Sequence, residues 1–323
     1  MQERLEWIDR IKGFAILLVV IGHVYIFSFG VTDTLVYKVI ASFHMHLFMF
    51  ISEFVAYVSP EVKDVYKKVL KRICSYVCPA YLIGFVISAY LQIVPVEVEY
   101  VHFNGYWYLK SLAIFCVIQL LLLRCKRILI EIIIVLVILS LFYFGWRCSP
   151  LLSEMLCLEH NVLFYPFFLC GYYVKRFNLI DALLHSNWLF TIGLLGYFFF
   201  SALCFPNDLI TELTQRYLAP LMAVIAIVYY FSNVKSTRIN KYLEYLGGRT
   251  LDIYLYHYLF IINFSMLNIK ELCMSLFSSD NTFIAFFLSL LVSVILIHLS
   301  VFVGDFLKTS VVIRKVIYGQ IMK

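Results

Sequence analysis

Apolar stretches long enough to cross a lipid bilayer recur along the whole chain, and they constrain its fold more than any other feature. A helix needs about 20 mostly apolar residues to span the hydrocarbon core. No extended polar domain separates the stretches. The sequence therefore predicts an all-α, polytopic integral membrane protein with about ten transmembrane helices, at 12–30, 36–58, 73–94, 107–123, 128–145, 160–174, 187–205, 216–232, 250–269 and 282–304.

The amino-acid composition supports a membrane protein. Of the 323 residues, 63% are hydrophobic and 14% are charged, whereas a soluble domain is about half apolar and about a quarter charged. This excess cannot be hidden in one soluble core, because a soluble fold still needs a wide polar surface. The net charge of +6 is not gathered into a basic face, which excludes nucleic acid as a partner. We expect one integral-membrane domain over residues 1–323.

The positions of the basic residues predict the orientation. Cytoplasmic loops of membrane proteins carry an excess of Lys and Arg. If the ten segments alternate in direction from a cytoplasmic N-terminus, nearly all basic residues fall on the cytoplasmic side. A wrong number of segments would place the basic residues of the later loops on the opposite side of the membrane. We therefore expect both termini in the cytoplasm, with only five of the 26 basic residues outside: Lys38, Lys110, Arg147, Arg216 and Lys270.

The first apolar segment contains ionisable residues that a simple membrane anchor does not need. In WIDRIKGFAILLVVIGHVYIF, residues 7–27, Lys12 precedes His23 by 11 residues. On a helix this is three turns plus about 20°, and about 16 Å along the axis. Asp9 lies close to the same stripe. Ionisable groups at membrane depth are costly and suggest function. The alternative is a histidine that packs between helices, together with ordinary interfacial charges.

The second segment carries a further histidine pair. In FHMHLFMFISEF, residues 43–54, Glu53 follows His46 by seven residues and shares its helix face, whereas His44 points nearly opposite. A carboxylate near an imidazole outlines an acid–base pair, because it fixes the tautomer and supports the charged form. The same spacing would also suit a metal or a proton pathway. The alternative is that one histidine packs and the other meets lipid headgroups.

Five segments, taken in order, resemble a known family. They are WIDRIKGFAILLVVIGH, FHMHLFMFIS, YWYLKSLAIF (106–115), YPFFLCGYYVKR (165–176) and TLDIYLYHYLF (250–260). Together they are similar to the acyltransferase-3 family of integral-membrane acyltransferases with about ten helices. Within that family the chain most resembles the sugar O-acetyltransferase branch that includes fucose 4-O-acetylase-like proteins.

The resemblance implies roles for the charged residues. His23 matches the histidine regarded as essential for transfer, and Asp9 and Lys12 are its candidate catalytic companions. Lys12 stands where the family usually has Arg, and Asp9 is expected to pair with Lys12 or with a cation of the third helix. The donor would be acyl-CoA, with acetyl-CoA expected, and no bound cofactor or metal. The candidate acyl-CoA contacts are Lys12 and a basic patch entering the third helix, although that patch could instead only contact anionic lipid. The patch comprises Lys67, Lys68, Lys71 and Arg72.

Candidate acceptor-binding residues come from several segments. His46 and Glu53 replace the proline and glycine usual in the family's second helix. Aromatic rings near the start of the fourth segment could stack on a sugar, although Trp and Tyr are also enriched at membrane interfaces. A histidine of the ninth segment could equally be a packing residue. The complete set is His44, His46, Glu53, Tyr106, Trp107 and His257.

These expectations define an enzyme of the bacterial inner membrane. It would move an acyl group from cytoplasmic acyl-CoA to a hydroxyl of a sugar in a lipid-linked or cell-surface glycan. Membrane lipid would surround the protein. The rival function is a transporter or flippase for a glycan or lipid-linked sugar, since intramembrane His and Glu also suit proton-coupled transport. Inverted repeats or paired broken helices would favour transport, and the sequence displays neither. A purely structural membrane subunit is the third alternative.

Overall fold

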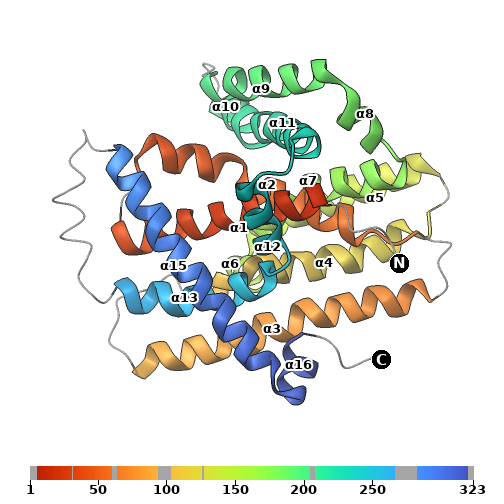
Figure 1. Ribbon diagram of the computed structural model, residues 1–323. Coiled ribbons are helices and arrows are strands. Elements are labelled where there is room, and N and C mark those ends of the chain that lie inside the picture. Colours follow the sequence, from red (N-terminus) through yellow and green to blue (C-terminus); the bar gives the residue numbers. More distant parts are fainter. Residues whose placement is uncertain are drawn as a thin grey trace. The chain divides into compact units, whose positions relative to one another are not determined.

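In the computed structural model, every regular element within the described residues is a helix, which confirms the all-α class (Figure 1). The structure describes residues 6–30, 32–59, 64–93, 103–125, 127–203, 208–265 and 282–318. The chain divides into two compact units. Unit 1 comprises Met1–Val55 and Leu169–Gly304, and unit 2 comprises Ala56–Phe168 and Asp305–Lys323.

Unit 1 is built around the first helix. Helix α1 (Glu6–His23) has acidic residues in its first turn, where they complement the positive end of the helix dipole. It runs directly into the π-helix η1. The other elements of unit 1 are η1 (Val24–Phe29), α2 (Leu35–Ala56), the last part of α7 (Leu158–Arg176), α8 (Ile180–His185), α9 (Asn187–Ala202), α10 (Asp208–Leu213), η3 (Thr214–Leu218), α11 (Ala219–Asn233), α12 (Arg238–Gly247), α13 (Thr250–Ser265) and most of α15 (Thr282–Lys308).

Unit 2 contains a long helix, α3, that packs along α4. Pro79 lies inside α3 and Pro166 inside α7, which membrane helices tolerate when neighbouring groups satisfy the freed backbone. Besides the first part of α7 and the end of α15, unit 2 comprises α3 (Val65–Ile93), η2 (Phe103–Tyr106), α4 (Trp107–Leu122), α5 (Ile128–Cys148), α6 (Pro150–Leu156) and α16 (Val311–Ile317).

Each of the ten predicted segments coincides with a helix in its described part. Among the described residues, six helices are long and apolar enough to cross a membrane: Glu6–Phe29, Leu35–Ala56, Val65–Ile87, Ile128–Cys148, Asp208–Asn233 and Ile284–Lys308. Helices α4 and α9 are apolar but shorter. It therefore stays a prediction that α4, α7, α9 and α13 cross the membrane. The cytoplasmic position of both termini also stays a prediction.

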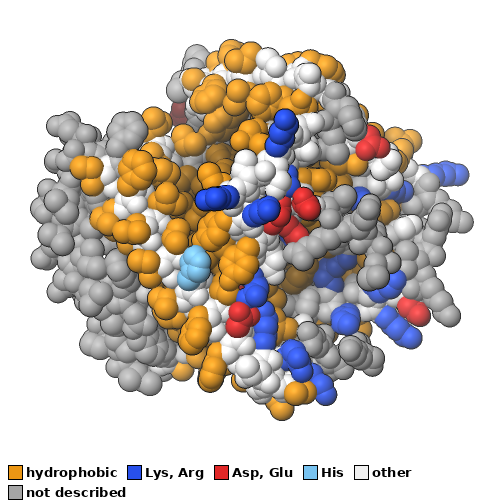
Figure 2. Space-filling model, in the orientation of Figure 1, with side chains coloured by type: hydrophobic (Ala, Val, Ile, Leu, Met, Phe, Trp, Pro, Cys, Tyr) orange, Lys and Arg blue, Asp and Glu red, His pale blue; other side chains and the backbone are white. Residues whose placement is uncertain are grey.

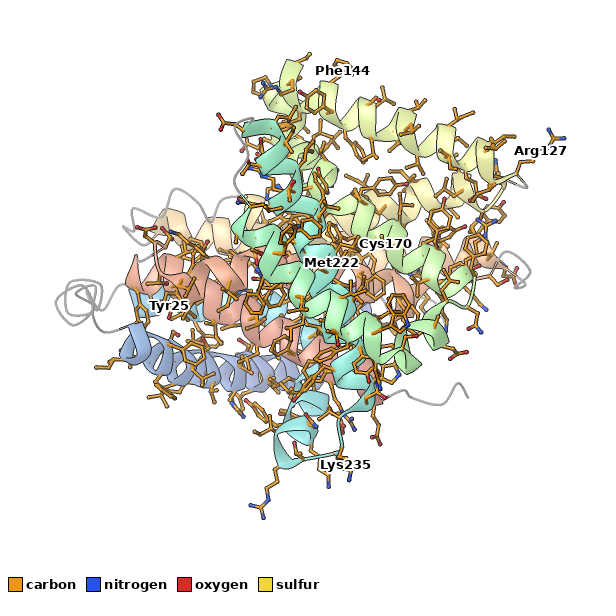
Figure 3. All side chains as sticks on the ribbon, turned by 90° about the horizontal axis from the view of Figure 1, so that it is seen from above. Tyr25, Arg127, Phe144, Cys170, Met222 and Lys235 are labelled. Atoms are coloured by element: carbon orange, nitrogen blue, oxygen red, sulfur yellow. The ribbon has the colours of Figure 1, made fainter. Side chains whose placement is uncertain are left out.

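The apolar outer surface is the one a lipid-embedded protein needs. Figure 2 shows apolar side chains over much of the described surface on the face it draws, with acidic and basic side chains gathered in a few places. Helix α5 is the extreme case, with Leu129 and Leu141 exposed by 70% and 65%. Glu131 is its buried residue, so its one acidic group faces protein. Arg127 and Phe144 lie toward opposite ends of this helix (Figure 3).

The packing of α1 against α12 brings two backbones into direct contact. Figure 1 shows α12 beside α1. A Cβ added at Gly13 would overlap the carbonyl of Leu243, and a Cβ added at Gly247 would overlap the backbone of Asp9. A glycine on each helix therefore permits the close crossing, as small residues do in membrane helix pairs. This crossing fixes the start of the helix that carries His23.

Candidate functional site

A hydrogen bond joins His23 at the end of α1 to His257 in the middle of α13. The Nδ1 atom of His23 lies 2.9 Å from Nε2 of His257. The two rings are parallel within 4° and their centroids lie 5.1 Å apart, an arrangement that suits an in-line bond between ring nitrogens. His257 is fully buried, and His23 is partly buried. The first apolar segment and the ninth therefore meet at a pair of imidazoles.

The hydrogen bonds of His23 and His257 determine which ring nitrogen carries the proton when both imidazoles are neutral. Nδ1 of His257 lies 2.8 Å from the carbonyl oxygen of Ile253, which can only accept, so this nitrogen carries the proton. A neutral His257 then has a lone pair on Nε2 and accepts from Nδ1–H of His23. His23 in turn keeps a lone pair on its own Nε2. The backbone carbonyl thus determines, through His257, which nitrogen of a neutral His23 keeps its lone pair.

Tyr258 lies next to Nε2 of His23, the ring nitrogen that keeps its lone pair. Its hydroxyl is 3.2 Å from Nε2 of His23, and with the tautomers above it is the donor. The Tyr258 ring also packs against His23 and His257, with centroids 4.9 Å and 4.3 Å away. A hydroxyl oxygen therefore already occupies the position from which a substrate hydroxyl could give its proton. The sequence analysis did not select Tyr258, and its place beside His257 in YLYHYLF was the only signal.

Two π-helical turns lie next to the site histidines. Tyr25, labelled in Figure 3, belongs to η1, which begins directly after His23. The second π-helix, η3, contains Arg216, whose backbone lies close to the His46 ring. Such turns are rare and occur frequently at functional sites. Their presence at both positions indicates that helix geometry is locally adjusted around these imidazoles.

The predicted residues of α2 lie at different depths in unit 1. His46 and Glu53 are both buried, with 4% and 0% exposure, as a shared inward face requires. His44 is partly buried and donates from Nδ1 to the carbonyl of Ile40, 2.7 Å away. It also interacts electrostatically with His23. The structure therefore brings His44 into the surroundings of His23, whereas sequence reasoning had emphasised the pair of His46 and Glu53.

Helix α7 approaches α2 through the glycine of the YPFFLCGYYVKR segment. A Cβ added at Gly171 would overlap the carbonyl of Phe50. The ammonium group of Lys175, one turn later, lies 5.0 Å from the centroid of the Phe54 ring, within the range of a cation–π contact. This segment therefore supports the α2 face that carries Glu53.

The start of α1 holds a group of ion pairs. Lys12 lies 2.8 Å from Asp9, which confirms the expected pairing. Arg10, which sequence reasoning missed, binds Glu244 at 2.7 Å and Glu6 at 2.9 Å. It also donates to the carbonyl of Val234, 3.1 Å away. Arg10 is almost fully buried, so it links α1 to α12 and to the end of α11.

The remaining predicted residues belong to unit 2. The basic patch lies on the first turns of α3, where Lys67, Lys68 and Lys71 are exposed and Arg72 is partly buried. Tyr106 is 3% exposed. These residues remain candidate acyl-CoA and acceptor contacts, and their roles stay predictions.

Trp107, at the start of α4, is part of an aromatic stack in unit 2. Its ring lies 4.2 Å from the ring of His160 and 5.0 Å from that of Phe164, measured between centroids. Sequence reasoning gave His160 no role because no motif includes it. The contact shows that Trp107 is held by two rings of α7 rather than displayed alone.

The hydrogen-bonded pair predicts that His257 acts through His23. Replacing His257 with phenylalanine keeps a flat ring but removes the acceptor for Nδ1–H of His23. The tautomer of His23 is then no longer fixed, and kcat should fall about 10²-fold while KM changes little. Restoring an acceptor with His257→Gln should recover part of the rate. Steady-state kinetics of both variants check this.

The matched control for His257 is His298→Phe, because His298 is an exposed histidine of the same unit that stacks on Tyr242. Its activity should equal that of the wild type. An equal loss of kcat in His257→Phe and His298→Phe would contradict a specific role for the pair.

Comparison with known proteins identifies the family of this chain. The acyltransferase-3 family model, described as an acyltransferase domain, matches residues 5–299, a range that includes His23, His257 and all five segments that carry the resemblance. No curated protein and no solved structure matched the chain. Together with the apolar helices, the match supports a membrane acyltransferase. The chain belongs to the acyltransferase-3 family.

Proposed function

We propose that the protein transfers an acetyl group from cytoplasmic acetyl-CoA to a hydroxyl of a sugar in a lipid-linked or cell-surface glycan, at a bacterial inner membrane. The observation that carries the proposal is the lone pair of His23 Nε2, which faces a hydroxyl oxygen at 3.2 Å. Transfer of an acyl group to an alcohol needs such a base. The resemblance to the fucose 4-O-acetylase-like branch supports a sugar as the acceptor.

The transfer can be written with His23 as general base. Nε2 takes the proton of the acceptor hydroxyl, and the oxygen adds to the thioester carbon. The C–S bond then breaks, and the CoA thiolate takes the proton back from Nε2. While His23 is charged, the lone pair of His257 Nε2 stabilises it across the 2.9 Å bond, as the third member of a catalytic triad does.

The same geometry also allows covalent catalysis. Nε2 could attack the thioester itself, expel the CoA thiolate and carry the acyl group to the acceptor. A hydroxyl 3.2 Å from Nε2, where that of Tyr258 lies, has the position that direct proton transfer needs, and the acceptor hydroxyl would displace it. His44, His46 and Glu53 would then contact the acceptor from α2, His257 would support the base, and Tyr106 and Trp107 would contribute stacking surfaces.

The basic patch of α3 is the proposed contact for the donor phosphates. Hydrogen bonds between cations and phosphate are among the stronger ones in proteins. Lys71→Ala combined with Arg72→Ala should raise the KM for acetyl-CoA about tenfold and leave kcat nearly unchanged. Initial rates over a range of acetyl-CoA concentrations measure this.

Another pair of adjacent cations in unit 2 serves as the control. Arg314 and Lys315 are exposed on α16, and Arg314→Ala combined with Lys315→Ala should keep the wild-type KM. If both double variants keep the wild-type KM for acetyl-CoA, the basic patch on α3 only sets the membrane topology or contacts lipid.

The decisive test uses labelled acetyl-CoA with the purified full-length protein in detergent. Transfer of label to a glycan acceptor, or release of CoA, supports the enzyme; its absence across sugar acceptors argues for the transporter. Glycan mass analysis of a deletion strain against its parent then identifies the acceptor. A lost increment of one acetyl group would support acetyl transfer, and a different increment would replace acetyl by another acyl group.

A further inference from the structure

A buried apolar cluster in unit 2 holds the start of α3 against the end of α4. Val65 and Val69, one turn apart on α3, pack against Cys116 of α4, and Leu123 at the end of α4 covers the same cluster. Residues three or four positions apart on a helix share one face, so the two valines present one apolar face to α4. The cluster therefore fixes the backbone position from which the next residue, Arg124, extends its side chain.

The exposed side chain of Arg124 reaches from the end of α4 to Tyr66 on the first turn of α3. Its Nε donates to the Tyr66 hydroxyl, 3.2 Å away, and its guanidinium carbon lies 5.5 Å from the centroid of the Tyr66 ring, within the range of a cation–π contact. A guanidinium has five N–H donors, and this bond uses the one on Nε. Within the described part of the chain the two Nη atoms have no hydrogen-bond or ion-pair partner. The end of the guanidinium fork is therefore open to a ligand.

The helix turns beside Arg124 are strongly basic. Tyr66 directly precedes the first lysine of the basic patch of α3. The patch contributes four cations and Arg124 a fifth, against one carboxylate in residues 64–72, that of Asp64, which pairs with Lys67 at 3.6 Å. Like charges held close together repel one another, and a bound anion removes this repulsion. The balance of charge on these turns therefore favours an anionic ligand.

We propose that Arg124 binds a phosphate group of the acyl donor together with the basic patch of α3, and that Tyr66 positions its guanidinium. The inference rests on the proposed use of acetyl-CoA, whose nucleotide part carries phosphates, and adds two residues to that donor site. An arginine fork gives phosphate two parallel hydrogen bonds, which the lysines of the patch cannot reproduce. Arg124 also belongs to the basic residues that the predicted orientation places in the cytoplasm, where acyl-CoA is found. The headgroup of an anionic lipid offers the same phosphate chemistry, so the test must separate the two.

The test measures binding of CoA and of adenosine 3′,5′-bisphosphate by calorimetry, with the purified full-length protein in nanodiscs of phosphatidylcholine at low salt. Arg124→Ala should weaken both ligands about three- to tenfold, and the difference should shrink as salt screens the exposed charge. Arg124→Lys keeps the charge without the fork and should fall between the two. Tyr66→Phe keeps the ring and should weaken binding less than Arg124→Ala, with no further effect when both are combined, because it acts through Arg124. Arg127→Ala is the matched control. Arg127 is an exposed arginine three positions later that extends outward at the start of α5 (Figure 3), and its variant should bind like the wild type.

Two further measurements separate donor phosphate from lipid phosphate. With acetyl-pantetheine, which lacks the nucleotide, Arg124→Ala should have the wild-type KM, while its KM for acetyl-CoA rises. If Arg124→Ala keeps the wild-type affinity for CoA, the inference is overturned and the acetyl-CoA reaction stands. If it instead weakens only the association of the protein with phosphatidylglycerol vesicles, Arg124 is a lipid contact and the donor role is equally overturned. A wild type that neither binds CoA nor transfers acetyl from it would show that the proposed donor is wrong, and this inference with it.

Discussion

Replacing His23 with alanine is expected to lower the rate of acyl transfer by about 10²–10⁴-fold, the usual contribution of a general acid–base group. The side chain carries the only lone pair that the Ile253–His257–His23 hydrogen bonds direct toward a hydroxyl. In the proposed transfer, the acceptor proton would then have no base and the departing thiolate would have no acid. The KM for acetyl-CoA should change little.

The loss in His23→Ala must be separated from a loss of folding. His23 is partly buried and lies at the end of α1, so the variant should insert, purify as a single species and keep its thermal unfolding temperature within a few degrees. His298→Ala is the matched control and should be fully active. Substantial turnover in purified His23→Ala would remove this histidine from the mechanism.

Gly13→Ala is expected to be the most disruptive small substitution in α1. Its Cβ would overlap the backbone carbonyl of Leu243, and a backbone atom cannot move aside as a side chain can. Overpacking usually costs about 1–3 kcal/mol and occasionally more. Here we expect the upper end or beyond, because α1 and α12 must separate and the Arg10–Glu244 pair between them is strained. The thermal unfolding temperature of the purified protein measures the effect.

The same helix provides the control for Gly13→Ala. A Cβ at Gly22 would meet the Ile40 side chain at 3.8 Å, an ordinary van der Waals contact. Gly22→Ala should therefore be neutral or slightly stabilising, since alanine is favoured over glycine inside a helix by about 0.5–1 kcal/mol. Equal unfolding temperatures for both variants would mean that α1 and α12 do not cross as closely as described.

The ionic contacts show where sequence reasoning succeeded and where it failed. The pairing of Asp9 with Lys12 could be predicted because residues three apart on a helix are neighbours. The ion pair of Arg10 with Glu244 could not, because it joins residues separated by 234 positions. Arg10 consequently looked like an ordinary interfacial charge, although it is among the most buried charged residues described in unit 1.

The two π-helical turns are a further feature that the sequence pattern did not reveal. The apolar length of the first segment predicted a continuous helix over residues 12–30, and the backbone is indeed helical through Phe29. The change from α to π geometry at Val24 leaves the apolar composition of the segment unaltered. The segment η1 packs against α13, a contact that composition does not specify.

The sequence by itself determined the all-α class and the positions of the apolar helices, because apolar length and helical periodicity are local properties of a chain. It also singled out His23 as a candidate catalytic residue. Only the tertiary structure decided what His23 touches. Its hydrogen bonds to His257 and Tyr258 join residues 234 and 235 positions apart. Periodicity specifies which side of a helix faces inward, whereas the partner on that side is fixed by the packing of distant helices. The tautomer that leaves a lone pair on Nε2 of His23 therefore follows from the fold.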